Sequence, residues 1–261
     1  MEIKDSRIDE GKAFDWGRTS EDYAKFRDIY PVQFYQKIAD KGLCIKGQHV
    51  LDLGTGTGVL PRNMYHYGAN WTGIDISSEQ IEQAKKLTSN AGMDIEYCAV
   101  PAEKMDFPDK TFDVITACQC FHYFDYEKLM PALSRVLKDN GKFLILYMEW
   151  LPFEDAIAGA SEELVLKYNP QWSGAGYTRQ PIAIPENNYF KLDFHEEYDI
   201  KVPFTRDSWN GRMKSCRGIG ASLSDAEIAK WEKEHLALLE KIAPNEFEIL
   251  HYATMAVLCK I

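Results

Sequence analysis

The chain has 261 residues, of which 45% are hydrophobic and 13% aromatic, so it can bury a substantial core and is not a disordered protein. Its formal net charge of −10 repels a phosphate backbone and disfavours nucleic-acid partners. Six cysteines without a Cys-x-x-Cys framework, and no apolar run that could span a bilayer, predict a cytoplasmic protein with no membrane partner.

The first predicted element is a helix over 20–30, which ends where Pro31 interrupts it. The preceding Thr19-Ser20-Glu21-Asp22 resembles a capping box. The residues that would share one face of this helix are Tyr23, Phe26, Arg27 and Tyr30. The arginine either stacks on a ring with its charged end in water, or reaches inward to pair a buried anion.

Between residues 48 and 148, short β-branched runs alternate with helical segments. Strands are predicted at 49–53, 71–76, 95–100, 112–117 and 142–148, and helices at 60–67, 78–91 and 126–137. Ser77 or Ser78 can cap the second helix, Gly92 can close it, and 138–142 is predicted to be the exit of the third. This alternation indicates right-handed βαβ units and a parallel sheet.

The remaining chain has weaker periodicity. Its predicted elements are helices at 153–168, 206–216 and 224–242, a strand near 194–202 and a last strand from 247 onward.

Residues 50–60 read VLDLGTGTGVL, an apolar run that ends in three glycines. A strand that leads through a glycine turn into a helix is a general nucleotide-binding device. The dinucleotide pattern G-x-G-x-x-G places its third glycine at the position of Val59, whereas here the third glycine is Gly58. A pyrophosphate ligand is therefore disfavoured.

Two acids accompany this turn. Asp52 precedes it and suits a cationic or hydroxyl-bearing ligand, unless it is a strand-end carboxylate held by backbone donors. Asp75 lies 21 residues after Gly54, where a carboxylate binds ribose hydroxyls in doubly wound folds. This second feature fits an adenosine cofactor and a dinucleotide equally well.

Four stretches in order, VLDLGTGTGVL, WTGIDIS, AEKMDFPDKTFDVIT and LSRVLKDNGKFLI, resemble class I S-adenosylmethionine-dependent methyltransferases, in the small-molecule group that includes trans-aconitate-type enzymes. The resemblance implies a single α/β domain with a Rossmann-like doubly wound sheet of seven strands, mostly parallel with an antiparallel last strand. The implied parts are a helical lid (14–47), a cofactor-binding core (48–148), a substrate-cap insertion with one sheet strand (149–245) and a final strand (246–261).

The resemblance also implies S-adenosyl-L-methionine as cofactor and S-adenosyl-L-homocysteine as product. The residues implied for the methionine and ribose side are Asp52, Gly54, Gly56 and Gly58. Asp75 would bind the ribose hydroxyls, Ile76 would pack on adenine, and the Ala102–Glu103 turn would meet the adenine edge. Cys118 and Gln119 would contact the methionine moiety, or else are a buried thiol and a strand-end amide.

The segment YAKFRDIYP resembles the lid of this family, which favours an Arg27 that reaches inward to the cofactor's carboxylate. Tyr23 of this segment and Trp16, just upstream of it, are candidate substrate-pocket residues, with plain packing as the alternative for the isolated Trp16.

The acceptor is predicted from a basic segment, 201–218, which carries five basic residues and one acid. Trp209, Arg212, Met213 and Cys216 would share a helical face there. A guanidinium beside apolar neighbours can hold a carboxylate bidentately, so the predicted acceptor is a small acid bound by Arg212. The further candidate acceptor contacts are Trp150, Arg179, Trp209 and Arg217. The alternative is a solvated basic face that neutralises an acidic surface.

His122 is the histidine best placed for proton transfer, because its loop faces the transferred methyl group in the family. Alternatively it packs between aromatic residues, and a carboxylate acceptor needs no base. The group Cys118, Cys120 and His122 lacks a fourth ligand, so no metal site is predicted.

The expected reaction is in-line displacement of the activated methyl group by a small-molecule acceptor. Three alternatives compete: an NAD-dependent oxidoreductase, a protein that binds S-adenosylmethionine and transfers nothing, and a methyltransferase for macromolecules. The glycine spacing disfavours the oxidoreductase, and the acidic net charge disfavours a methyltransferase for macromolecules.

Overall fold

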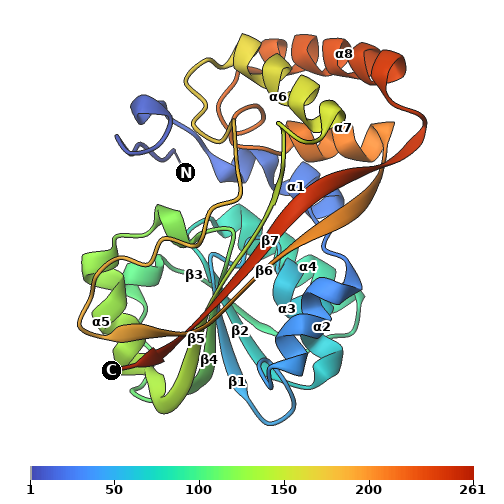
Figure 1. Cartoon of the computed structure of the whole chain (residues 1–261). Coiled ribbons are helices and arrows are strands. Elements are labelled where there is room, and N and C mark those ends of the chain that lie inside the picture. The colour runs from blue at the N-terminus through green and yellow to red at the C-terminus, as the bar shows by residue number, and fades with distance from the viewer. Residues whose placement is uncertain (1) are drawn as a thin grey trace. The chain divides into compact units, whose positions relative to one another are not determined.

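A seven-stranded sheet organises the fold in a computed structural model that describes residues 2–261 (Figure 1). The strands are β1 (His49–Leu53), β2 (Asn70–Asp75), β3 (Glu96–Ala99), β4 (Phe112–Cys118), β5 (Leu137–Trp150), β6 (Phe190–Thr205) and β7 (Glu246–Lys260). Their order is β3-β2-β1-β4-β5-β7-β6. The first five strands pair in parallel and β6 and β7 are antiparallel, which confirms the predicted α/β class.

The residues fall into two compact units. The sheet unit comprises Tyr30–Met148, Pro181–Tyr198 and Ala253–Ile261. The helical unit comprises Met1–Ile29, Glu149–Gln180 and Asp199–Tyr252. The three strands β5, β6 and β7 each contribute residues to both units.

Helices complete each unit (Figure 1). Those of the sheet unit are α2 (Val32–Asp40), α3 (Val59–Met64), α4 (Ser78–Asn90), α5 (Tyr126–Val136) and the 3-10 helices η3 (Tyr65–Tyr67), η4 (Ala102–Lys104) and η5 (Phe121–Tyr123). Those of the helical unit are α1 (Ser20–Phe26), α6 (Ala156–Tyr168), α7 (Arg206–Lys214), α8 (Asp225–Ile242) and the 3-10 helices η1 (Asp9–Gly11) and η2 (Trp16–Thr19).

The central strands are buried because parallel strands are covered on both faces. In β1 every residue after His49 is buried, and Leu51 and Leu53 share a core with Ile115 of β4 and Leu129 of α5. The carboxyl ends of β1, β2 and β4 are therefore fixed by the core beneath them.

Capping chemistry sets the bounds of α4 as predicted. The Ser77 hydroxyl accepts a hydrogen bond from the backbone N–H of Gln80 at 3.3 Å, and Gly92 follows the helix at φ +65°. The exit predicted at 138–142 is wrong, because β5 already begins at Leu137, which pairs with Phe112. Sheet pairing extends the strand through a segment whose residues are typical of a turn.

The N-terminal helix is shorter than predicted. α1 ends at Phe26, and Arg27 is its C-cap. Tyr30 lies outside the helix, because Pro31 disfavours helical backbone at the residue that precedes it. The predicted capping box is also wrong, since the Thr19 hydroxyl makes no capping bond and donates instead to the carbonyl of Trp16 at 3.1 Å.

Within residues 2–261, none of the helices combines the length and the apolar character needed to cross a lipid bilayer. The six cysteines are all free thiols.

Candidate functional site

The glycine turn follows β1 at the carboxyl end of the sheet, with Gly54, Gly56 and Gly58 at φ +56°, +56° and +74°. A Cβ at Gly54 would lie 2.9 Å from the Cβ of Cys120, and one at Gly58 would lie 2.2 Å from the Tyr97 hydroxyl. Both the backbone conformation and the close neighbours therefore require glycine. The turn can bring its backbone very near to a ligand.

Asp75 ties this turn to the end of β2. Its carboxylate accepts hydrogen bonds from the backbone N–H of Gly56 at 2.9 Å and of Ser77 at 2.8 Å. Burial raises the pKa of Asp75, and these N–H donors partly oppose the rise. The carboxylate is therefore held in one place beside the turn, as recognition of a ribose requires.

Asp52 lies in the sheet with a side chain that is only 2% exposed. Its carboxylate accepts a hydrogen bond from the Thr116 hydroxyl at 2.6 Å. Burial raises the pKa of Asp52 to about 7, the hydrogen bond from Thr116 lowers it, and the charge of Asp75 raises it further. Its predicted contact with the cofactor stays a prediction, but its charge state near neutral pH is sensitive to a nearby cation.

The predicted adenine side begins at Ile76, which is 42% exposed and offers an apolar surface just after β2. Ala102 is buried in the core at the start of η4. The neighbouring Glu103 carboxylate accepts a hydrogen bond from the backbone N–H of Asp125 at 3.0 Å, and so holds the start of α5.

Gln119, just after β4, has the unusual φ of +63° for a residue that is not glycine. Its amide nitrogen donates to the carbonyl of Met148 at 2.5 Å, while its Oε1 is buried with no hydrogen-bond partner. Strained backbone and an orphaned acceptor are features of ligand sites. The preceding Cys118 thiol lies 3.7 Å from the hydroxyl of Tyr30.

These residues of the sheet unit fit an adenosyl ligand. Ile76 offers an apolar surface, Asp75 a fixed acceptor for hydroxyls, and Gln119 a buried acceptor for an ammonium group. The Asp52 carboxylate beside the turn is unfavourable for a pyrophosphate, whereas Asp75 is compatible with either ligand.

His122 lies in η5 with an exposed side chain. Its Nδ1 is 3.1 Å from the Tyr147 hydroxyl, which also accepts a hydrogen bond from the backbone N–H of His122. The catalytic role of His122 stays a prediction.

In the helical unit, α7 buries the predicted face. Trp209 and Met213 are fully buried, and Arg212 is only 3% exposed. The Arg212 guanidinium lies over the ring of Trp150, 4.8 Å from its centroid, and its Nη1 is 3.0 Å from the Cys216 sulfur. The hypothesis of a solvated basic face is therefore wrong for Arg212.

The other predicted acceptor contacts have structural partners. Arg217 forms a buried bidentate ion pair with Asp9, at 2.7 and 3.0 Å. Arg179 pairs at the surface with Asp199 and Glu154. The indole nitrogen of Trp209 donates to the Ser161 hydroxyl at 2.9 Å.

Arg27 makes the stacking contact that the sequence left as one of two possibilities. Its guanidinium lies 4.6 Å from the ring centroid of Tyr23. Trp16 meets the edge of the same ring with centroids 6.2 Å apart. Pairing of Arg27 with the cofactor's carboxylate stays a prediction.

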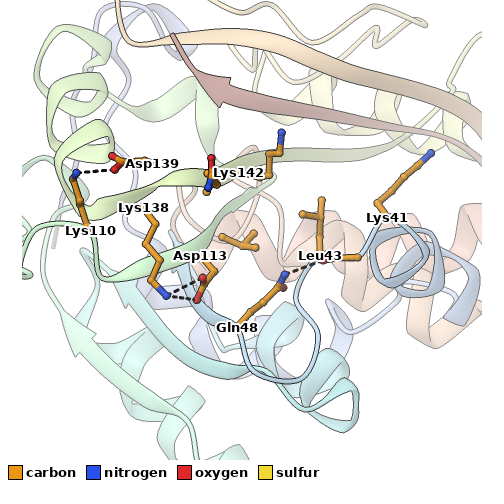
Figure 2. A pocket seen from close by; sticks show the side chains of 12 residues that line it. Lys41, Leu43, Gln48, Lys110, Asp113, Lys138, Asp139 and Lys142 are labelled. Carbon is orange, nitrogen blue, oxygen red and sulfur yellow. Dashed lines mark hydrogen bonds and ion pairs between the residues drawn. The ribbon is translucent and has the colours of Figure 1, made fainter.

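A separate cavity of about 590 Å³ opens at the amino ends of β4 and β5 (Figure 2). Its lysines face acids: Lys138 pairs with Asp113 and Lys110 with Asp139, each at 2.8 Å. Ligands of open parallel sheets bind at the opposite, carboxyl ends of strands, so this cavity is not the candidate site.

No group of three or more metal-ligating side chains, counted over residues 2–261, is arranged to hold a metal ion.

Comparison with known proteins identifies the family. Residues 51–145 match the family described as "Methyltransferase domain". A ubiquinone biosynthesis O-methyltransferase from Pseudomonas entomophila is 30% identical over 159 residues, which cover 60% of this chain and 67% of that protein. The chain spans about half the length of several other curated relatives that it matches.

Solved structures share the fold. A putative type II methyltransferase from Anaeromyxobacter dehalogenans superposes with a TM-score of 0.55 at 16% identity, covering 89% of this chain and 97% of that one. The [4+2]-cyclase SpnF superposes with a TM-score of 0.51 at 17% identity, covering 87% and 80%. The chain belongs to the class I S-adenosylmethionine-dependent methyltransferases, whose cofactor is S-adenosylmethionine.

Proposed function

We propose that this methyltransferase acts on a small-molecule acceptor that carries a carboxylic acid. The observation that supports the acid is Arg212, a guanidinium that is 3% exposed and stacked on the buried ring of Trp150. A buried guanidinium strongly favours an anion as partner, and its fork matches a carboxylate.

The cofactor supplies an activated methyl group with its own leaving group. The chain mainly binds and orients the reactants, and good alignment can contribute roughly 7–11 kcal/mol to lowering the barrier. Asp75 would hold the ribose hydroxyls and Gln119 Oε1 the ammonium group, while Ile76 would cover the adenine.

A second candidate is an acceptor with a hydroxyl or amine, and the exposed His122 beside the Tyr147 hydroxyl favours it. An imidazole can take up the proton that such an acceptor releases, whereas a carboxylate has none to lose. We expect His122→Asn to lower kcat only a few-fold if the acceptor is an acid, and about 100-fold or more if His122 is a base.

The direct experiment is uptake of labelled methyl groups from S-adenosylmethionine by a panel of small carboxylic acids, amines and thiols. Methyl ester formation on acids supports the proposal. Labelling of neutral amines alone rejects the acid, and binding of S-adenosylhomocysteine without any transfer indicates a protein that only binds the cofactor.

A further inference from the structure

The Tyr97 side chain reaches the glycine turn from two strands away. Tyr97 lies in β3, in register with Gly73 of β2, and Gly73 is in register with Asp52 of β1. Residues in register on neighbouring parallel strands point to the same face of the sheet. A side chain at position 73 would therefore separate Tyr97 from β1, and Gly73 leaves that space to the tyrosine ring.

The ring fills the space beside two glycines. A Cβ at Gly73 would lie 2.8 Å from each of two ring carbons of Tyr97 and 2.8 Å from the Thr55 hydroxyl. A Cβ at Gly58 would lie 2.2 Å from the Tyr97 hydroxyl, 2.9 Å from its Cζ and 3.1 Å from its Cε1. The φ of Gly73 is outside the left-handed region, so close packing alone requires glycine at that position.

The two halves of the turn are supported differently. Its first half is tied to β2, because the backbone N–H of Thr55 donates to the carbonyl of Ile74 at 2.9 Å. The N–H of Gly58, the N-cap of α3, donates to the carbonyl of Thr55 at 2.9 Å, a bond within the turn itself. Contact with the Tyr97 side chain therefore connects the second half of the turn to the sheet.

Helix α4 holds the Tyr97 ring in place. Tyr97 is buried in a small core with Ile81 and Ala84 of this helix. The buried Thr88 hydroxyl, also from α4, donates to the Tyr97 hydroxyl at 3.2 Å. Packing and a hydrogen bond thus make the ring a rigid support for the turn.

A site binds more tightly when its groups are already held in place before the ligand arrives. We propose that Tyr97 is a positioning residue for the cofactor: its ring supports Gly58 and fixes the second half of the glycine turn in the conformation that receives the adenosyl ligand. This inference rests on the proposed function, because it takes the turn after β1 as the place where S-adenosylmethionine binds.

The test is titration calorimetry of the full chain with S-adenosylhomocysteine, together with thermal unfolding of the free chain. Tyr97→Leu keeps an apolar side chain but removes the hydroxyl, Cζ and Cε1 atoms nearest to Gly58. We expect it to weaken S-adenosylhomocysteine binding about tenfold, because a loosened turn must be ordered on binding. Tyr97→Phe keeps the ring and should bind within about twofold of the wild type.

The matched control is Ile81→Ala, which weakens the same small core from α4 and removes no atom beside the turn. It should lower the Tm at least as much as Tyr97→Leu and leave the affinity for S-adenosylhomocysteine unchanged. A merely structural Tyr97 would lower the Tm without changing the affinity, and that result would overturn the inference. An equal loss of affinity in Ile81→Ala would overturn it too.

A double variant tests the contact itself. Leucine lacks the three atoms that a Cβ at position 58 would meet. Gly58→Ala combined with Tyr97→Leu should therefore bind S-adenosylhomocysteine about threefold more tightly than Gly58→Ala alone, although the unfavourable φ remains. If the losses of affinity in the two single variants simply multiplied, the proposed contact would be contradicted.

Asp75→Ala separates this inference from the proposed function. If neither Asp75→Ala nor Tyr97→Leu changes the affinity, S-adenosylhomocysteine binds away from the turn and the cofactor site of the proposed function is rejected. If Asp75→Ala weakens binding and Tyr97→Leu does not, only the role of Tyr97 is overturned.

Discussion

The charged side chains at the glycine turn and the charged side chain of Arg217 are held by different means. In the sheet unit, a hydroxyl group holds Asp52 and two backbone N–H groups hold Asp75, and these donors carry no charge. In the helical unit, Arg217 is held by the opposite charge of Asp9. Neutral donors leave a carboxylate's charge available to a cationic ligand, whereas an ion pair neutralises it. The sheet unit therefore suits a sulfonium, whereas the charge of Arg217 in the helical unit is already neutralised by Asp9.

The largest effect is expected from breaking the buried ion pair of the helical unit. Arg217→Met should lower the free energy of unfolding by about 3–5 kcal/mol, because it leaves Asp9 buried without its counter-charge. Chemical denaturation measures this. The double variant Asp9→Asn with Arg217→Met should recover part of the loss, and a double variant less stable than either single one would contradict the pairing.

In the sheet unit, Gly58→Ala should cost about 2–4 kcal/mol, because φ is +74° and the new Cβ would meet the Tyr97 hydroxyl. Binding of S-adenosylhomocysteine should fall with it. The matched control is Gly92→Ala, which has φ +65° but open space for a Cβ. It should cost only about 1–2 kcal/mol and leave the cofactor affinity unchanged. If Gly58→Ala and Gly92→Ala changed the affinity for S-adenosylhomocysteine equally, the glycine turn would not be the binding site.

The pH dependence of cofactor binding tests the availability of the Asp52 charge. Folding raises the pKa of Asp52 to about 7, so its neutral form is favoured in the folded chain and stability falls as the pH rises toward 7. We expect affinity for the cationic S-adenosylmethionine to rise about tenfold from pH 5 to 8, as Asp52 ionises. Neutral S-adenosylhomocysteine should show little change, and Asp52→Asn should remove the difference. If the affinities for both ligands rose equally with pH, the charge of Asp52 would have no role in binding the sulfonium.

The smallest effect is expected at Arg179, which pairs with Asp199 and Glu154 at the surface. Exposed pairs contribute little to stability. Arg179→Gln should leave the Tm and the binding of butanoate, a small carboxylate probe of the acceptor site, at their wild-type values. A loss of butanoate affinity would restore Arg179 to the acceptor site that the sequence predicts.

The sequence predicted the sheet unit well because alternating β-branched runs and helix caps are local signals. The start of β5 at Leu137 was missed because pairing with Phe112, not local composition, extends the strand. The strained φ of Gln119 has no sequence signal.

The helical unit was harder to predict. Arg212 was recognised from its apolar neighbours on one helix face, but its proximity to Arg27 arises from packing between segments far apart in the sequence. Glu149 was not singled out, because a single acid at the end of an apolar strand gives no indication that arginine charges oppose the rise of its pKa on burial.

The most direct test of the central claim is calorimetric titration of the intact chain with S-adenosylhomocysteine and, in parallel, with NAD. We predict saturable binding of one S-adenosylhomocysteine per chain that Asp75→Ala abolishes, and no binding of NAD. Saturable NAD binding with no heat from S-adenosylhomocysteine would show that the turn after β1 holds a dinucleotide, and would contradict the account.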